Sequence, residues 1–130
     1  MNGRWTWGIL AGAILGAAAL AAAPAASADD ACGTKENPCP LQKWMRQNMA
    51  PSNASGDMAA LAADFDKVSR IAPDPKWNGG DPRGNWDAIA KAGIAAAKAN
   101  DAAGVKAACK SCHDAFKDKY KAQFRTRAVP

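Results

Sequence analysis

Residues 102–125 read AAGVKAACKSCHDAFKDKYKAQFR, and this stretch decides the fold. Apolar and weakly polar side chains recur in it at every third or fourth position, which is the spacing of one face of an α-helix. These side chains are Val105, Cys109, Cys112, Phe116 and Tyr120. The run contains no proline and no alternation with a period of two residues. We therefore expect a long helix from about Ala102 to about Arg125.

The preceding chain contains three more segments with helical spacing. The first begins at Pro38 and carries apolar residues from Leu41 to Met49. Proline interrupts a helix interior, so Pro51 is expected to end this segment. Residues 52–57 are then typical of a turn, with Ser55 as a candidate cap for the next helix.

The second segment covers residues 58–72, and the Pro- and Gly-rich stretch 73–84 after it predicts a loop. Asn85 is a candidate cap for the third helix, and Asn100-Asp101 is expected to end that helix and to cap the next one. No segment has the pattern of a β-strand. Four amphipathic helices with one longer connection predict an all-α fold, an antiparallel four-helix bundle.

The last helix contains the motif C-x-x-C-H at residues 109–113, a specific signal for covalent attachment of c-type haem. On a helix, Cys109, Cys112 and His113 share one face. The two thiols can form thioethers with the haem vinyl groups, and the imidazole then reaches the iron from the same side. A thioredoxin-like site would need an α/β pattern, and a zinc site a fourth ligand. The sequence thus predicts one covalent haem c, with His113 as the proximal iron ligand.

The other axial ligand is narrowed by elimination. His113 is the only histidine in the chain, and no methionine follows it. A methionine ligand would have to be Met45, Met49 or Met58, and the first two are four residues apart. Methionines also commonly fill cores, in which case the sixth position would be open or occupied by lysine.

Residues 1–28 differ from the remainder of the chain. Arg4 precedes an apolar, Ala-rich run, and Ala26-Ser27-Ala28 has the small-x-small pattern of a cleavage site. These features predict a secretory signal peptide, although an uncleaved anchor is the alternative. We expect a soluble periplasmic protein without stable membrane insertion after cleavage. Its parts would be an N-terminal loop over 29–37 and a haem-binding domain over 38–130.

Two cysteines remain outside the haem motif, namely Cys32 and Cys39. Exported proteins meet an oxidising compartment, where a neighbouring pair of thiols is expected to form a disulfide. The chain has a net charge of +5, and loss of the signal peptide with Arg4 would leave +4. The positive excess favours docking to an acidic redox partner. Nucleic-acid binding is not expected, because an exported protein rarely meets nucleic acid and the lysines are spread along the sequence.

Residues 109–117, Cys-Lys-Ser-Cys-His-Asp-Ala-Phe-Lys, resemble the class II c-type cytochromes, a group that includes cytochrome c′ and its low-spin relatives. The resemblance covers about residues 38–125 and implies that Lys117 lies near the haem edge. In that family a Leu or Met five residues after an aromatic faces the iron. Trp44 and Met49 have this spacing here. Met49 thus implies the low-spin, electron-transferring branch, and the family also implies a homodimer by analogy.

We therefore expect a monohaem electron carrier that meets redox partner proteins. Four lysines of the last helix could form the docking face: Lys110, Lys117, Lys119 and Lys121. The alternatives are a five-coordinate protein that binds NO or CO, and a haem-free helical interaction module with two disulfides. An enzyme is not expected, because the chain has no second histidine and no pairing of a nucleophile with a base.

Overall fold

The regular structure consists of helices in this computed structural model, which describes residues 32–81 and 84–130. No strand occurs within those two ranges, so the all-α prediction is confirmed for them. The predicted signal peptide over 1–28 lies outside the described residues. None of the helices in the described ranges is both long enough and apolar enough to cross a bilayer.

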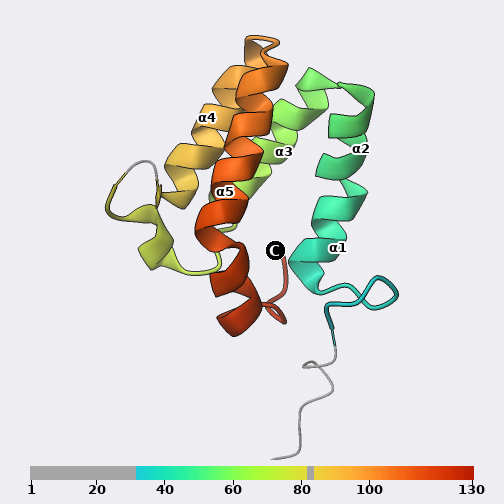
Figure 1. The fold of residues 1–130 in the computed structure, drawn as a ribbon, viewed down its shortest axis with the longest axis vertical. Helices are drawn as coiled ribbons and strands as arrows, with labels where there is room; N and C mark the ends of the chain where they lie inside the picture. The colour runs from blue at the N-terminus through green and yellow to red at the C-terminus, as the bar shows by residue number, and fades with distance from the viewer. Residues whose placement is uncertain (1–31, 82–83) are drawn as a thin grey trace, which may run out of the picture.

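Helical elements follow one another along the described part of the chain, as Figure 1 shows. Figure 1 shows α3, α4 and α5 side by side, with α1 and α2 following one another along the other side of the molecule. The short element η2 lies within the connection between α3 and α4. The elements are α1 Pro40–Gln47, α2 Met49–Ser55, α3 Met58–Arg70, η2 Pro75–Asn78, α4 Trp86–Lys98 and α5 Ala102–Gln123.

The first predicted helix is in fact two helices that meet at Asn48. The backbone N–H and the side-chain Nδ2 of Asn48 both donate to the carbonyl of Trp44, at 3.0 and 2.8 Å. The prediction that Pro51 ends the helix is wrong, because Pro51 is the third residue of α2. A proline is tolerated there, since the first backbone N–H groups of a helix have no partner inside it.

The predicted turn over residues 52–57 is also wrong in most of its length. Helix α2 continues to Ser55 and ends at Gly56, which adopts a left-handed conformation with φ 69°. Asp57, and not Ser55, caps α3 by accepting a hydrogen bond from the N–H of Ala60 at 2.9 Å. Asp is among the best N-cap residues, so composition favoured Asp57 as much as Ser55.

The predicted caps of the last two helices are confirmed. Asn85 accepts a hydrogen bond from the N–H of Ala88 at 3.0 Å at the start of α4. Asp101 accepts one from the N–H of Gly104 at 2.9 Å at the start of α5. These side chains satisfy N–H groups that otherwise have no partner inside the helix. The two caps therefore set where α4 and α5 begin.

Two groups of buried side chains form the core. The first core cluster joins α1, the end of α3, the start of α4 and the middle of α5, and it consists of Leu41, Val68, Ile71, Trp86, Ile89, Ala90 and Phe116. The second core cluster joins the start of α3, the end of α4 and the start of α5, and it consists of Leu61, Phe65, Ala97, Val105 and Ala108. The C-x-x-C-H motif is in the middle of α5, where Cys112 packs against the first cluster and Cys109 against the second.

Candidate functional site

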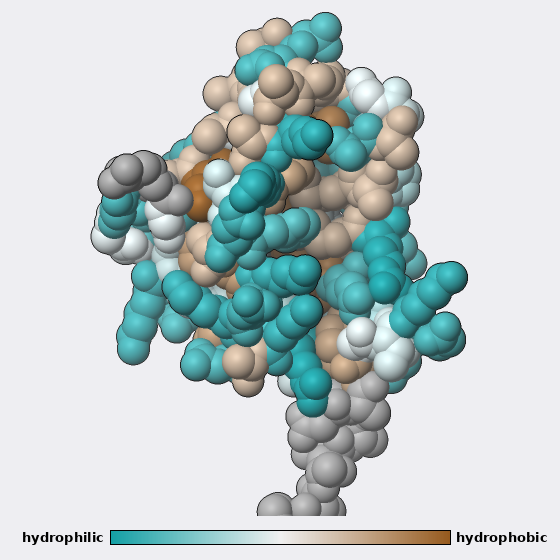
Figure 2. Space-filling model, in the orientation of Figure 1, coloured by the Kyte–Doolittle hydropathy of each residue, from teal (hydrophilic) through white to brown (hydrophobic). Residues whose placement is uncertain are grey.

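A cavity of about 430 Å³ lies between α1 and α5. Figure 2 shows this face of the molecule: hydrophilic side chains cover its lower part, and a strip of more apolar ones appears between the two elements. The lining side chains come from α1, α5, the start of α4 and the N-terminal loop. They are Cys32, Gly33, Cys39, Leu41, Gln42, Met45, Trp86, Cys112, His113, Phe116, Lys117, Tyr120, Lys121 and Arg125.

The motif residues of α5 divide between this cavity and the core. Cys112 and His113 line the cavity, and the His113 side chain is exposed. Cys109 is one turn earlier, half-buried, and packs against the second core cluster instead. Neither cysteine is in a disulfide. The motif therefore presents an imidazole and one thiol to the cavity and places the other thiol next to it along the helix.

The electrostatics of the two thiols differ from those of a redox-active C-x-x-C. Burial raises the pKa of Cys112 to about 12, and the neighbouring Cys109 adds to the effect. Burial also raises the pKa of Cys109, against a smaller lowering by a backbone hydrogen bond. Catalytic C-x-x-C thiols have a pKa below the ordinary value, so that a thiolate forms near neutral pH. The raised pKa values disfavour a thioredoxin-like site.

The two methionine candidates of the N-terminal segment are placed differently. Met45 lines the cavity, on the wall formed by α1. Met49 does not line it and packs against both core clusters, while Met58 packs against the second. The break at Asn48 explains this separation, because Met45 and Met49 belong to different helices and do not share a helix face. No residue type near Asn48 indicates that break.

The chemistry of the lining suits a flat, mainly apolar group with charged edges. Leu41, Trp86 and Phe116 supply apolar surface, and Trp86 and Phe116 are in edge contact with ring centroids 5.3 Å apart. Lys117 and Lys121 contribute cationic groups that reach the exposed side of α5. A cavity with an apolar interior and a few placed polar groups is the usual form of a cofactor site. The residues present fit a haem, whose ring is apolar and whose propionates are anionic.

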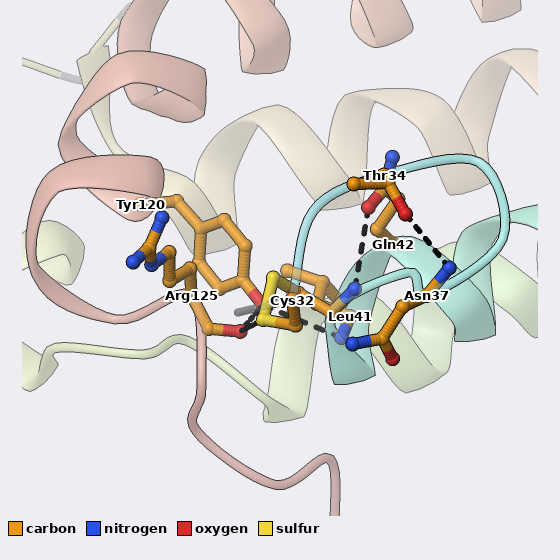
Figure 3. The surroundings of a disulfide bond; sticks show 8 residues. Cys32, Thr34, Asn37, Leu41, Gln42, Tyr120 and Arg125 are labelled. Carbon is orange, nitrogen blue, oxygen red and sulfur yellow. Dashed lines mark hydrogen bonds between the residues drawn. A yellow bond between two sulfur atoms is a disulfide. The ribbon is translucent and has the colours of Figure 1, made fainter. Parts of the chain in front are cut away.

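The predicted disulfide between Cys32 and Cys39 is confirmed, with an S–S distance of 2.01 Å. Both cysteines line the cavity, so the loop that they close forms part of its wall. Figure 3 shows this loop beside Tyr120 and Arg125 of the C-terminal part. The Sγ atom of Cys32 lies 3.8 Å from the carbonyl oxygen of Arg125. A disulfide sulfur has no proton to donate, so this is a packing contact.

No family model, no curated protein and no solved structure matches the chain. The site must therefore be interpreted from its own residues. Within residues 32–81 and 84–130, no three His, Cys, Asp or Glu side chains converge to hold a metal ion by themselves. A haem iron requires far less from the protein, because the porphyrin supplies four ligands and side chains supply one or two.

Several cavity residues were not singled out as site residues by sequence reasoning. Tyr120 was expected only as a member of an apolar helix face, and Trp86, Gln42 and Arg125 had no predicted role in the site. Tyr120 is the most informative of these, because its hydroxyl accepts a hydrogen bond from the N–H of Leu41 at 3.3 Å. The only available signal was that Tyr is the one residue of the α5 stripe with a polar tip.

Proposed function

We propose that this chain is an exported monohaem c-type cytochrome that carries electrons in the periplasm. In this proposal the helices form an antiparallel four-helix bundle that encloses a haem attached through Cys109 and Cys112. One observation supports it above all others: Cys112 and His113 of the C-x-x-C-H motif line the same cavity as Met45, which belongs to a different helix. A motif without function would not need a cavity beside it.

The proposed iron ligands follow from the placement of the side chains. His113 is the proximal ligand, delivered from α5 by its position next to Cys112. Met45 is the distal ligand, because it lines the cavity from α1. This choice departs from Met49, which the family resemblance implied, since Met49 does not line the cavity. A haem held by His and Met supplies a one-electron ferrous/ferric couple, and the thioether raises its potential.

The remaining residues serve electron transfer by shaping the surroundings of the haem. Trp86 and Phe116 are each 3% exposed and form a wall that excludes water from one side of the cavity. A dry wall favours the less charged state of a redox group, because low polarity penalises charge. Lys117 and Lys121 are placed to offset anionic groups at the open side.

The proposed partner is an acidic redox protein that docks next to the cavity. The α5 lysines are exposed, and Lys117 and Lys121 also line the cavity, so a docked anionic surface would lie close to the haem. Lys110 pairs with Asp114, and Lys119 lies over the Phe116 ring at 5.6 Å. Lys117 and Lys121 are therefore the better anchors, with steering that weakens as salt increases.

Covalent haem is tested on a denaturing gel, where only attached haem survives to be stained. We expect the protein matured in a periplasm to stain, and the double variant Cys109→Ser/Cys112→Ser to lose the stain completely. The matched control is Cys32→Ser/Cys39→Ser, which removes the same number of thiols from the other pair and should still stain. An unstained wild-type protein would contradict the proposal and favour the haem-free interaction module.

A gas-binding haem protein is the second candidate, because apolar Leu41 and Phe116 side chains line the cavity together with Met45. Without a Met–iron bond, such a lining would leave room for a small diatomic ligand. The ferric absorption spectrum separates the two functions. A Met–iron charge-transfer band supports the electron carrier, whereas a high-spin spectrum with ready binding of CO or NO supports the alternative.

A further inference from the structure

The two walls of the cavity meet through buried side chains, because Leu41 of α1 and Phe116 of α5 belong to the first core cluster, while the backbones of the two helices have few close contacts. Helix α1 packs mainly on α2, and among the described elements α5 packs mainly on α4. In Figure 1 these two helices lie on opposite sides of the space in which the cavity is found. Apolar packing is not directional, so a hydrogen bond between α1 and α5 would fix their separation more closely, and with it the separation of Met45 from His113.

The hydroxyl of Tyr120 makes that contact, as Figure 3 shows. It accepts a hydrogen bond from the backbone N–H of Leu41 at 3.3 Å and donates one to the carbonyl of Arg125 at 2.9 Å. Leu41 is the second residue of α1, so its N–H has no partner inside the helix. Tyr120, a residue of α5, thus completes the first turn of α1 from across the cavity.

The N-terminal loop also helps to hold the beginning of α1 in place. The Arg125 carbonyl that accepts from Tyr120 is also in contact with Sγ of Cys32. The disulfide partner Cys39 directly precedes α1, and its N–H donates to the side chain of Gln42 at 3.2 Å. The beginning of α1 is therefore attached to α5 through the phenol and to the N-terminal loop through the disulfide.

Met45 lies one helical turn after Leu41, on the same face of α1. A shift of the first turn of this short helix would be carried directly to the sulfur of Met45. We propose that Tyr120 is a positioning residue whose hydroxyl sets the distance across the cavity and so stabilises Met45 on the iron. This inference rests on the proposed function, because it concerns the occupancy of an iron ligand.

The test compares wild-type holoprotein with Tyr120→Phe, which keeps the ring and removes only the hydroxyl. The variant loses both hydrogen bonds of the hydroxyl, and loss of the one that reaches Leu41 of α1 is expected to raise the ratio of Met-dissociated to Met-bound ferric iron about fivefold. The readouts are the Met–iron charge-transfer band, the high-spin signal in paramagnetic resonance, and the rate of CO binding to the reduced protein. The haem stain should be unchanged.

Ser52→Ala is the matched control, because the Ser52 hydroxyl also joins two helices. It donates to Asp64 at 3.0 Å, linking α2 to α3 away from the cavity lining. This variant should lose some stability but keep the wild-type spectrum. Equal spectra for wild type, Tyr120→Phe and Ser52→Ala, all with stained haem, would overturn the positioning role while leaving the proposed function intact. A wild-type protein without haem would overturn both.

A second measurement does not depend on folding of the variant. Amide hydrogen exchange in the reduced wild-type protein reports directly on the N–H of Leu41. Protection of this amide is expected, since Tyr120 supplies the partner that the helix does not. Exchange of Leu41 as fast as an unprotected amide would overturn the proposal, because the phenol would then not be holding α1.

Discussion

The two core clusters show how one helical protein can be closed at one end and hollow at the other. The second core cluster is built from small or medium side chains, including Ala97, Val105 and Ala108, where the helices approach closely. Gly93 shows how closely: a Cβ atom there would lie 2.5 Å from a ring carbon of Phe65. Dispersion contacts at this density leave no space for a guest.

The first core cluster differs from the second, because it contains larger aromatic rings and borders the cavity. Trp77, Trp86 and Phe116 contact one another, with Trp77 and Phe116 stacked at 4.8 Å between ring centroids. On the side facing α1, Trp86 and Phe116 line the cavity, and Leu41 of α1 belongs to the same cluster. The comparison of the two ends shows that the cavity is local and lies beside Cys112 and His113 of the C-x-x-C-H motif.

The two methionines that lie on either side of Asn48 provide the sharpest test of this contrast. We expect Met45→Ala to abolish the Met–iron band with little loss of stability. Met49→Ala should keep that band but lower the free energy of unfolding by about 2 kcal/mol, more than Met45→Ala does, because the partly buried Met49 packs against both core clusters and Met45 against the first. Absorption spectra and denaturant unfolding of both variants check this. The reverse pattern would show that Met49 is the ligand.

Removal of the disulfide tests the hollow end alone. The Cys32→Ser/Cys39→Ser variant should lose about 2–3 kcal/mol of unfolding free energy, the entropic effect expected for a short closed loop. Because this loop forms part of the cavity wall, binding of CO to the reduced protein should also become faster. Denaturant unfolding and stopped-flow absorption measure the two effects. A change in stability without a change in CO binding would show that the loop does not control access.

Substitution of Gly93 tests the closed end. Gly93→Ala places a methyl group against the Phe65 ring, and overpacking of this kind costs about 1–3 kcal/mol. The haem spectrum should remain unchanged. Gly84→Ala is the control, because a Cβ there meets nothing within 4 Å. Thermal unfolding of the two variants gives the comparison, and an equally stable Gly93→Ala protein would refute tight packing between α3 and α4.

The smallest effect is expected from the ionisation of Tyr120, the only tyrosine in the chain. Burial raises its pKa in the folded protein, against a smaller lowering by the hydrogen bond from Leu41. The unfolded chain therefore loses this proton first, at its ordinary pKa of about 10. Stability from this group is complete below that pH and falls as pH rises toward the folded value.

This dependence is measured by denaturant unfolding of wild type and Tyr120→Phe at mildly and strongly alkaline pH. The wild-type protein should lose more stability than the variant over that interval. Ultraviolet difference absorption of the phenolate follows the titration of this single residue in the same samples. Identical pH dependence in both proteins would show that the phenol is not buried by folding.

Much of the fold could be predicted from the sequence, because helix spacing and caps are local properties. Asn85 and Asp101 were identified as caps from residue type alone, and both act as caps. The interpretation of Pro51 failed because proline has opposite meanings in the interior of a helix and in its first turn. The break at Asn48 has no strong signal in composition. The sequence therefore did not show that a new helix begins at Met49, with Pro51 in its first turn.

The candidate site was predictable where it lies within one helix and not where it spans several. Cys109, Cys112 and His113 are close in sequence, and their placement on α5 follows from helix geometry. The choice between Met45 and Met49 depends on how α1 is oriented against α5, which is a tertiary property. The hydrogen bond between Tyr120 and Leu41 joins residues 79 positions apart, and no local sequence pattern predicts it.

The shortness of α1 has one more consequence, for the order in which the molecule assembles. A helix of eight residues is not stable by itself, whereas α3, α4 and α5 bury one another over 13, 13 and 22 residues. We expect the three longer helices to form one cooperative unit and α1 to be the first part to open. Opening of α1, which carries Met45, would then also let a large cofactor reach Cys109 and Cys112.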